Sequence, residues 1–141
     1  MYKPDQAREK KEQILEKVRE YFGQRPEVPL VLVFGSLAKA KFRPDSDVDI
    51  AIGAKRAFSP ELLFAMNSDL ALMLERPVDL VDLGNCGGLV AREALTQGFR
   101  IKFDRDLYVR YLNSMLVFVE DYLPLLRTMQ DARIRSFTDG S

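Results

Sequence analysis

The 141-residue sequence contains no histidine and only one cysteine. Without imidazole, the chain cannot build a Ser-His-Asp triad or a histidine zinc site. Any catalysis must therefore use carboxylates, hydroxyls, lysine, arginine or a bound metal. The single thiol, Cys86, can form no internal disulfide and has no cysteine or histidine partner, so we expect it to be inert. A reducing cytoplasm is the expected location.

Net charge and long apolar runs are also absent. Lys and Arg together number 21, and so do Asp and Glu, which leaves no positive field for an extended nucleic-acid groove. The longest uncharged apolar run, residues 28–37, is too short to span a bilayer. The charged first residues do not resemble a secretory signal, and no membrane association is expected.

The pattern of apolar residues predicts one α/β (α+β) domain over residues 1–141. A small mixed β-sheet of about four strands, covered by helices, is the architecture this order favours. Ser59 and Pro60 mark the start of one helix as its cap and first residue. The expected strands are 30–34, 48–52, 78–83 and 99–103, and the expected helices are 5–22, 60–76, 89–97 and about 106–129.

The last of these helices is apolar over an unusually wide face. Tyr108, Leu112 and Met115 follow one seam, whereas Tyr111 and Leu116 lie off it. Such width predicts burial on more than one side. Two readings stay open: the helix contributes to a homo- or hetero-oligomer, or it packs entirely against its own sheet. Pro124 is expected to kink or end its regular part.

Two short motifs lie on the first pair of expected strands. Gly35-Ser36 ends an apolar run, and such a turn lets a phosphate approach backbone N–H groups and the hydroxyl. Asp47 and Asp49 are two apart, which on a strand puts both carboxylates on one face with Cα atoms about 6.6 Å apart. Partly buried like charges repel each other, and a divalent cation relieves that repulsion. Oxygen ligands without histidine or cysteine favour Mg²⁺.

A third carboxylate is available on the strand expected at 78–83. Asp79 and Asp82 are three residues apart, so on a regular strand they point to opposite faces. Only one of them can join the pair at 47 and 49, and strand geometry alone leaves the choice open.

These motifs together resemble a known family. The stretch GSLAKAKFRPDSDVDIAI at 35–52 resembles the Gly-Ser, ten-residue, Asp-x-Asp signature of the DNA polymerase β-like nucleotidyltransferase superfamily. Within it, the sequence is most similar to minimal nucleotidyltransferases, the antitoxins of HEPN/MNT toxin–antitoxin pairs. The family's strand that carries the third carboxylate is resembled by residues 76–83, RPVDLVDL. Its closing helix and strand are resembled by residues 93–106, EALTQGFRIKFDRD. The resemblance spans about residues 28–107 and implies the nucleotidyltransferase fold.

The resemblance also implies roles for individual residues. Gly35 and Ser36 would hold the nucleotide phosphates, and Asp47 and Asp49 would bind two Mg²⁺ ions. Asp79, which follows Arg-Pro-Val as in the family, would be the third carboxylate, ligating one metal and helping to deprotonate the acceptor. Two metals suit an in-line displacement at phosphorus.

Basic residues near these motifs are weaker candidates. Arg43, with Lys39 and Lys41, lies between the two motifs, and Arg76 precedes the third carboxylate. Each could reach triphosphate oxygens, and we include Arg43 among the nucleotide-binding candidates. A polar loop between strands would have the same composition.

The function that the resemblance implies is transfer of AMP from ATP to a tyrosine hydroxyl of a partner HEPN ribonuclease toxin, which silences the toxin. One alternative is an antitoxin that acts by forming a complex, without catalysis. Another is a small-molecule nucleotidyltransferase of the aminoglycoside-modifying kind, which would usually need an added acceptor domain.

Overall fold

The computed structural model describes residues 4–38, 43, 46–121, 124–125 and 127–132. Each strand expected from the sequence is present, and the N-terminal helix and the two central helices are found close to their expected bounds. In chain order the elements are α1 (Pro4–Gly23), β1 (Leu30–Phe34), the 3-10 helix η1 (Gly35–Ala38), β2 (Val48–Gly53), α2 (Pro60–Leu74), β3 (Val78–Asp82), α3 (Gly88–Gln97), β4 (Phe99–Lys102) and α4 (Arg105–Asp121).

The strands form one mixed sheet in the order β3-β2-β1-β4, which confirms the expected architecture. β1 pairs antiparallel with β2 and with β4, and β3 runs parallel to β2. Each residue of β1 is buried, because the strand is central and both of its faces are covered. This position explains why its sequence, LVLVF, is continuously apolar instead of alternating.

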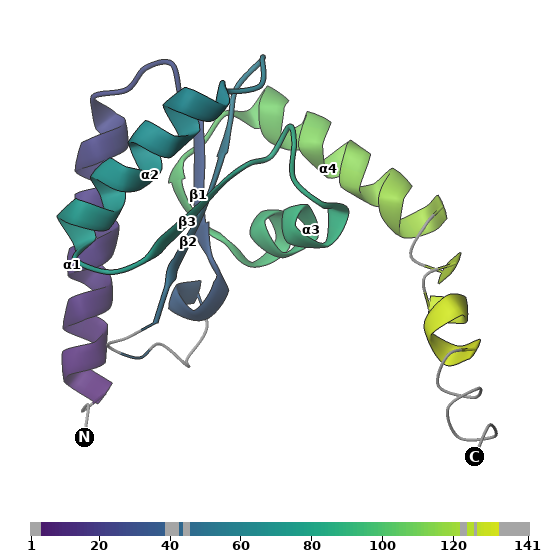
Figure 1. The fold of residues 1–141 in the computed structure, drawn as a ribbon, viewed down its shortest axis with the longest axis horizontal. Helices are drawn as coiled ribbons and strands as arrows, with labels where there is room; N and C mark the ends of the chain where they lie inside the picture. Colours follow the sequence, from purple (N-terminus) through teal and green to yellow (C-terminus); the bar gives the residue numbers. More distant parts are fainter. Residues whose placement is uncertain (1–3, 39–42, 44–45, 122–123, 126, 133–141) are drawn as a thin grey trace.

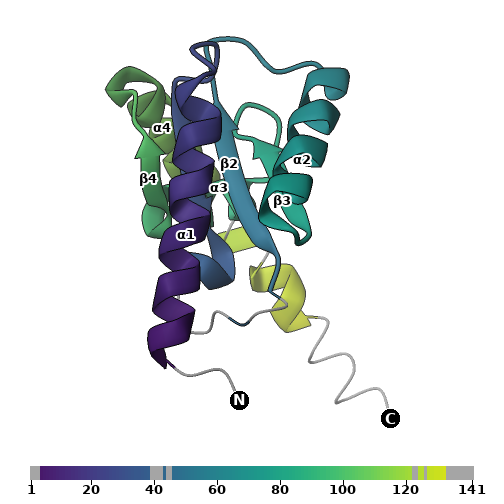
Figure 2. The same cartoon turned by 90° about the vertical axis from the view of Figure 1, so that its left-hand side faces the viewer.

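Helices cover both faces of the sheet. α1 and α2 lie on one side, and α3 and α4 lie on the other (Figures 1 and 2). Because successive strand residues face opposite sides, the core divides into two clusters. Val31, Val33, Ile50 and Ile52 pack with α1 and α2, whereas Leu30, Leu32, Phe34, Ala51 and Val81 pack with α3 and α4.

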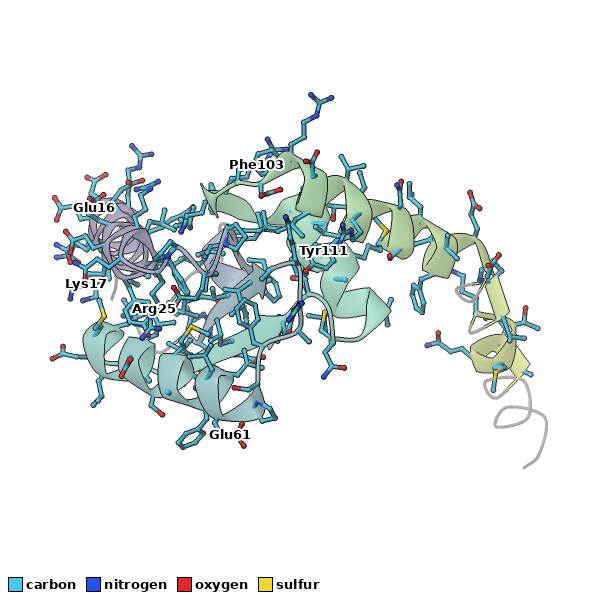
Figure 3. All side chains as sticks on the ribbon, turned by 90° about the horizontal axis from the view of Figure 1, so that it is seen from above. Glu16, Lys17, Arg25, Glu61, Phe103 and Tyr111 are labelled. Atoms are coloured by element: carbon cyan, nitrogen blue, oxygen red, sulfur yellow. The ribbon has the colours of Figure 1, made fainter. Side chains whose placement is uncertain are left out.

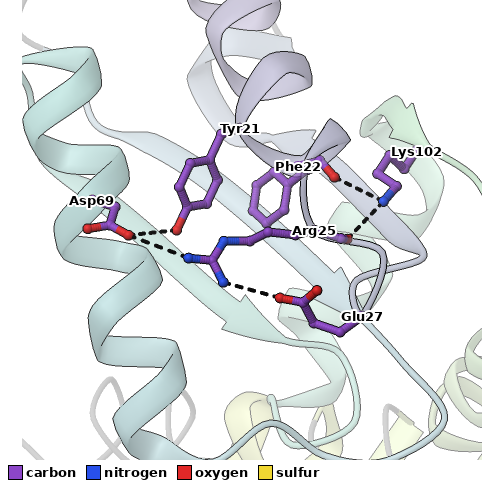
Figure 4. A network of polar contacts seen from close by, with 6 residues as sticks. All are labelled: Tyr21, Phe22, Arg25, Glu27, Asp69 and Lys102. Atoms are coloured by element: carbon purple, nitrogen blue, oxygen red, sulfur yellow. Dashed lines mark hydrogen bonds and ion pairs between the residues drawn. The ribbon is translucent and has the colours of Figure 1, made fainter.

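α1 and α2 are joined by a polar contact at the rim of their face (Figure 4). The hydroxyl of Tyr21 donates to the Asp69 carboxylate at 2.9 Å, and Arg25 lies 3.7 Å from the same carboxylate. Burial, followed by the hydrogen bond to Asp69, raises the pKa of Tyr21 to about 12. The phenol therefore stays protonated and keeps donating at any physiological pH.

The side chain of Lys102 in β4 caps the C-terminal end of α1 (Figure 4). Its ammonium donates to the backbone carbonyl of Phe22 at 3.0 Å and to that of Arg25 at 3.1 Å. The last carbonyls of a helix lack intrahelical partners and carry a partial negative charge, so a lysine here is favourable. This contact ties β4 to α1 across a long sequence separation.

α4 packs on its own domain through aromatic rings placed over glycines. Tyr111 lies against Gly53, where an added β-carbon would be 2.6 Å from the ring, and its hydroxyl donates to the carbonyl of Ala54 at 2.9 Å (Figure 3). Phe118 lies against Gly88 in the same way, at 2.7 Å. Two residues off the predicted seam are not equivalent, because Tyr111 packs inward whereas Leu116 is 47% exposed.

α4 begins after a capping residue and its far end is described in part. Asp104 accepts a hydrogen bond from the N–H of Leu107 at 3.0 Å at the start of the helix. Residues 124–125 and 127–132 are helical, but the predicted kink at Pro124 depends on residues 122–123, which lie outside the described residues. Among the helices of the described ranges, none is long and apolar enough to cross a membrane.

Candidate active site

The Gly-Ser turn forms η1 directly after the central strand β1. Gly35 has a positive φ of 75°, which L-residues with a side chain rarely adopt. An added β-carbon there would also lie 2.9 Å from Cγ of Asp49. Glycine is therefore required twice, for its backbone conformation and for the space that the carboxylate occupies. Ser36 follows with its hydroxyl donating to the carbonyl of Asp47 at 3.5 Å.

Two of the three candidate carboxylates lie side by side on neighbouring strands. Asp49 of β2 and Asp79 of β3 are direct partners in the parallel register. Each is two residues before an apolar residue, Ala51 or Val81, that packs on the α3 and α4 side, so both carboxylates project to that face. Asp49 is half-buried and Asp79 is exposed.

Asp47 lies just outside β2. It precedes the first residue of the strand, where the expected bounds 48–52 place it, and is exposed. That its carboxylate shares a face with that of Asp49 stays a prediction. Its backbone is nevertheless held in place by neighbours. The N–H of Val48 donates to the carbonyl of Pro77 at 3.0 Å, and Arg76 donates to the carbonyl of Ser46 at 3.5 Å. The segment before β3 thus positions the peptide groups on both sides of Asp47.

The electrostatics of this group favour a cation. Burial, followed by the charges of Asp79, Asp47 and Glu93 in that order, raises the pKa of Asp49 to about 6. The carboxylates are therefore close enough to repel one another.

Asp82 is placed differently from the other carboxylates. It is 5% exposed and accepts hydrogen bonds from the N–H of Phe58 and from that of Gly84, both at 2.9 Å. Both of its oxygens are thus used to hold loops at the end of β3. Asp82 is therefore a buried residue that holds the fold together at the end of β3.

Glu93 of α3 was not anticipated from the sequence as a residue near the site. It belongs to an ordinary helical segment and has no fixed spacing from the Asp-x-Asp motif. Only the packing of α3 on the same face of the sheet brings it close enough to act on Asp49. Sequence offered one indirect signal, a polar stripe along one side of this helix.

Arg43 is exposed and hydrogen-bonds to Ser46, which lies shortly before β2. Its N–H donates to the Ser46 hydroxyl at 2.9 Å, and its carbonyl accepts from the Ser46 N–H at 3.0 Å. Contact with nucleotide stays a prediction for this residue. Lys39 and Lys41 lie outside the described residues.

The donor set suits a hard cation that takes part of its coordination from elsewhere. Within the described ranges, no three His, Cys, Asp or Glu side chains are grouped so as to hold a metal ion by themselves. Mg²⁺ seldom needs such a group, because it commonly binds one or two carboxylates together with substrate phosphates and water. The oxygen-only set of Asp49 and Asp79, with Asp47 beside them, fits that mode of binding.

Comparison with known proteins identified relatives in sequence and in structure. Over 73 residues the chain is 32% identical to the protein adenylyltransferase MntA of Shewanella oneidensis, a match covering 52% of each chain. The matched stretch thus spans about half the length of this curated relative.

Solved structures share the fold over most of the chain. A toxin–antitoxin crystal structure with AMP-PNP matches with a TM-score of 0.75 at 21% identity, covering 85% of this chain and 98% of the other. A complex of tri-AMPylated Shewanella oneidensis HEPN toxin with MNT antitoxin matches with a TM-score of 0.67 at 19% identity, covering 85% and 98%. At these identities the likeness establishes the fold.

The family assignment follows from a longer sequence match. Residues 16–107 match the family described as Polymerase beta, Nucleotidyltransferase. That range runs from the second half of α1 into the start of α4, and it includes the Gly-Ser turn, both aspartate motifs and the whole sheet. The chain therefore belongs to the polymerase β nucleotidyltransferase family.

Proposed function

We propose that the protein is an antitoxin nucleotidyltransferase that transfers AMP from ATP to a tyrosine hydroxyl of a partner HEPN toxin in the cytoplasm. The observation that carries this proposal is the pairing of Asp49 with Asp79 beside the Gly35-Ser36 turn in a chain of this family. Further support comes from relatives that are a protein adenylyltransferase and an MNT antitoxin in complex with a tri-AMPylated HEPN toxin.

Binding of the donor nucleotide, ATP, is assigned to the Gly35-Ser36 turn. Backbone N–H groups of η1 and the Ser36 hydroxyl would donate to phosphate oxygens, and Arg43 would add a positive charge. The small volume of Gly35 lets the phosphates approach the chain closely while leaving room for Asp49. Nucleotide binding requires the Ser36 hydroxyl to exchange its weak contact with the Asp47 carbonyl for a phosphate oxygen.

The carboxylates are assigned to metal binding and proton transfer. Asp47, Asp49 and Asp79 would hold two Mg²⁺ ions, which when bound offset phosphate charge and lower the pKa of the attacking hydroxyl. The tyrosine oxygen forms a bond to the α-phosphorus of ATP, the bond to the β-phosphate oxygen breaks, and pyrophosphate leaves. Asp79, the exposed member of the pair, accepts the phenol proton.

The test is transfer of label from α-labelled ATP to a HEPN protein as acceptor, with Mg²⁺ present. The double substitution of Asp47 and Asp49 by Ala should abolish labelling, whereas the exposed Asp106→Asn control on α4 should label normally. Label appearing on an aminoglycoside and not on protein would overturn the assignment of the acceptor.

A second candidate is an antitoxin that neutralises by complex formation alone. It is favoured by the apolar residues that α4 leaves exposed, including Leu116 at 47% and Val117 at 54%. The same double variant separates the two: neutralisation of the toxin at equal expression without labelling would favour the complex and contradict the enzymatic proposal.

A further inference from the structure

β3 is an edge strand, and its outward side is met by a side chain of α2. In the sheet order β3-β2-β1-β4, β3 has a strand neighbour, β2, on one side only. On its other side, Oδ1 of Asn67 accepts a hydrogen bond from the backbone N–H of Leu80 at 3.0 Å. α2, which carries Asn67, lies beside β3 (Figure 2). The amide therefore satisfies an N–H group that a further strand would otherwise bind.

Asn67 is a polar residue within a largely apolar helix face. Its neighbours on the same side of α2 pack in the core below the helix: Leu63, Met66, Leu70 and Leu74. Asparagine is unfavourable in a helix interior, because its amide competes with the backbone hydrogen bonds. A leucine at this position would continue the apolar face, so helix propensity and packing both favour replacing the asparagine. What the amide adds is the hydrogen bond to β3.

The group that Asn67 holds is the peptide between Asp79 and Leu80. The Leu80 nitrogen is bonded directly to the carbonyl carbon of Asp79, and a peptide group is planar, so fixing this N–H fixes the plane that adjoins the Asp79 Cα. The other side of the strand is fixed by β2, where Asp49 is the register partner of Asp79. Because the Asp79 side chain is exposed, packing does not set its direction, and the backbone must do so.

α2 is a well-anchored support for this contact. The hydroxyl of Ser59 caps its start and accepts from the N–H of Leu62 at 3.1 Å. Met66 and Leu70, which precede and follow Asn67 on the helix, are both fully buried. A residue that orients a functional side chain must itself be held by packing. Asn67 meets this requirement, because it projects from a capped helix packed on the core.

We propose that Asn67 is a positioning residue for the reaction: by holding the Asp79–Leu80 peptide, it orients the Asp79 carboxylate for metal binding. The inference rests on the proposed function, in which Asp79 ligates a metal and accepts the phenol proton. It adds a residue on a different element, α2, on which that carboxylate depends. Loss of a residue that orients a metal ligand typically lowers metal affinity or activity by about 10–100-fold.

The test compares two substitutions of Asn67. Asn67→Leu removes the acceptor oxygen, whereas Asn67→Asp keeps one. With a HEPN protein as acceptor, Asn67→Leu should lower kcat about tenfold and raise the half-saturating Mg²⁺ concentration about tenfold, with less than about a twofold change in the KM for the acceptor. Asn67→Asp should restore most of both losses. Ser59→Ala, which removes the cap of the same helix, is the matched control and should lower the Tm without changing the Mg²⁺ dependence.

A binding measurement tests the inference without transfer. The Kd for Mn²⁺ in the presence of ATP, with no acceptor, is measured from the EPR signal of free Mn²⁺. This Kd should rise about tenfold in Asn67→Leu and stay unchanged in Ser59→Ala. Unchanged Mn²⁺ affinity together with an unchanged Mg²⁺ dependence would overturn the positioning role, as would equal losses in both Asn67 variants. If wild type binds Mn²⁺ with ATP but transfers no AMP to a HEPN protein, the proposed function fails, whereas weaker Mn²⁺ binding by Asn67→Leu still supports the role of Asn67.

Discussion

Gly35 at the start of η1 and Asp49 of β2 occupy the same small space. The α-carbon of Gly35, at a φ of 75°, faces the Asp49 carboxylate so closely that an added β-carbon would lie 2.9 Å from its Cγ. The η1 turn and the half-buried carboxylate are therefore one packed unit. A side chain at position 35 would displace the carboxylate as well as strain the turn.

Gly35→Ala is expected to abolish AMP transfer and to destabilise the fold. The left-handed backbone alone costs about 1–2 kcal/mol for a residue with a β-carbon, and the contact with Asp49 adds to it. Gly87→Ala is the matched control, because nothing lies within 4 Å of an added β-carbon there. Thermal unfolding and labelling measure the two effects. Normal transfer by the Gly35 variant would contradict the packing argument.

Substitutions of Asp79 and Asp82 are expected to affect different properties, activity in the first case and stability in the second. Asp79→Asn should eliminate transfer with little loss of stability, since the side chain is exposed. Asp82→Ala should leave two backbone N–H groups without their acceptor, which costs about 1–3 kcal/mol for each that stays buried. Its folded fraction should still transfer AMP. Denaturant unfolding combined with activity per folded molecule tests this, and an active Asp79 variant would refute the assignment.

The metal-free protein should become less stable as Asp49 ionises. Its pKa is about 6 in the folded protein and 3.8 for an unperturbed aspartate, so the folded state holds the proton more tightly. That contribution to stability is complete below about pH 4 and is lost as the pH rises through 6. With EDTA present, Asp49→Asn should therefore raise the Tm at pH 7.5 and change it little at pH 4. An equal shift in Tm at pH 4 and pH 7.5 would show that ionisation of Asp49 is not the cause.

Arg76 is expected to act by positioning Asp47. Its contact with the Ser46 carbonyl fixes the peptide in front of that carboxylate. Arg76→Met should lower kcat by about tenfold at saturating ATP, as loss of an orienting contact typically does, and Arg76→Lys should restore part of it. A change confined to thermal stability would show a purely structural role.

Lys102→Met should destabilise the protein without affecting transfer. The substitution leaves the carbonyls of Phe22 and Arg25 without their charged donor, at a cost of about 1–2 kcal/mol. Lys55→Met, at an exposed loop position, serves as the control. Chemical denaturation compares the two variants, and equal stabilities would show that the backbone N–H groups of Arg25 and Val28 satisfy these carbonyls without the lysine.

Local sequence patterns were sufficient to predict the helices and strands and to locate the two motifs of the candidate site. Strand β1 is recognisable because a strand covered on both faces is apolar throughout, and α2 because Ser59 caps it, accepting from the N–H of Leu62 at 3.1 Å. The spacing of Gly35-Ser36 and Asp47-x-Asp49 depends only on neighbours along the chain. These features follow from short-range sterics and hydrogen bonding, which a sequence carries directly.

Tertiary structure alone decided which distant residues meet. The register of β2 with β3 places Asp79 beside Asp49, and the loops around Phe58 and Gly84 occupy Asp82. Packing of α3 on the sheet brings Glu93 to the same place. Sheet register and helix packing depend on contacts between residues far apart in sequence, so no local pattern contains them. The sequence determined where the Gly35-Ser36 turn and the aspartate motifs lie along the chain, and the fold determined which carboxylates surround that turn.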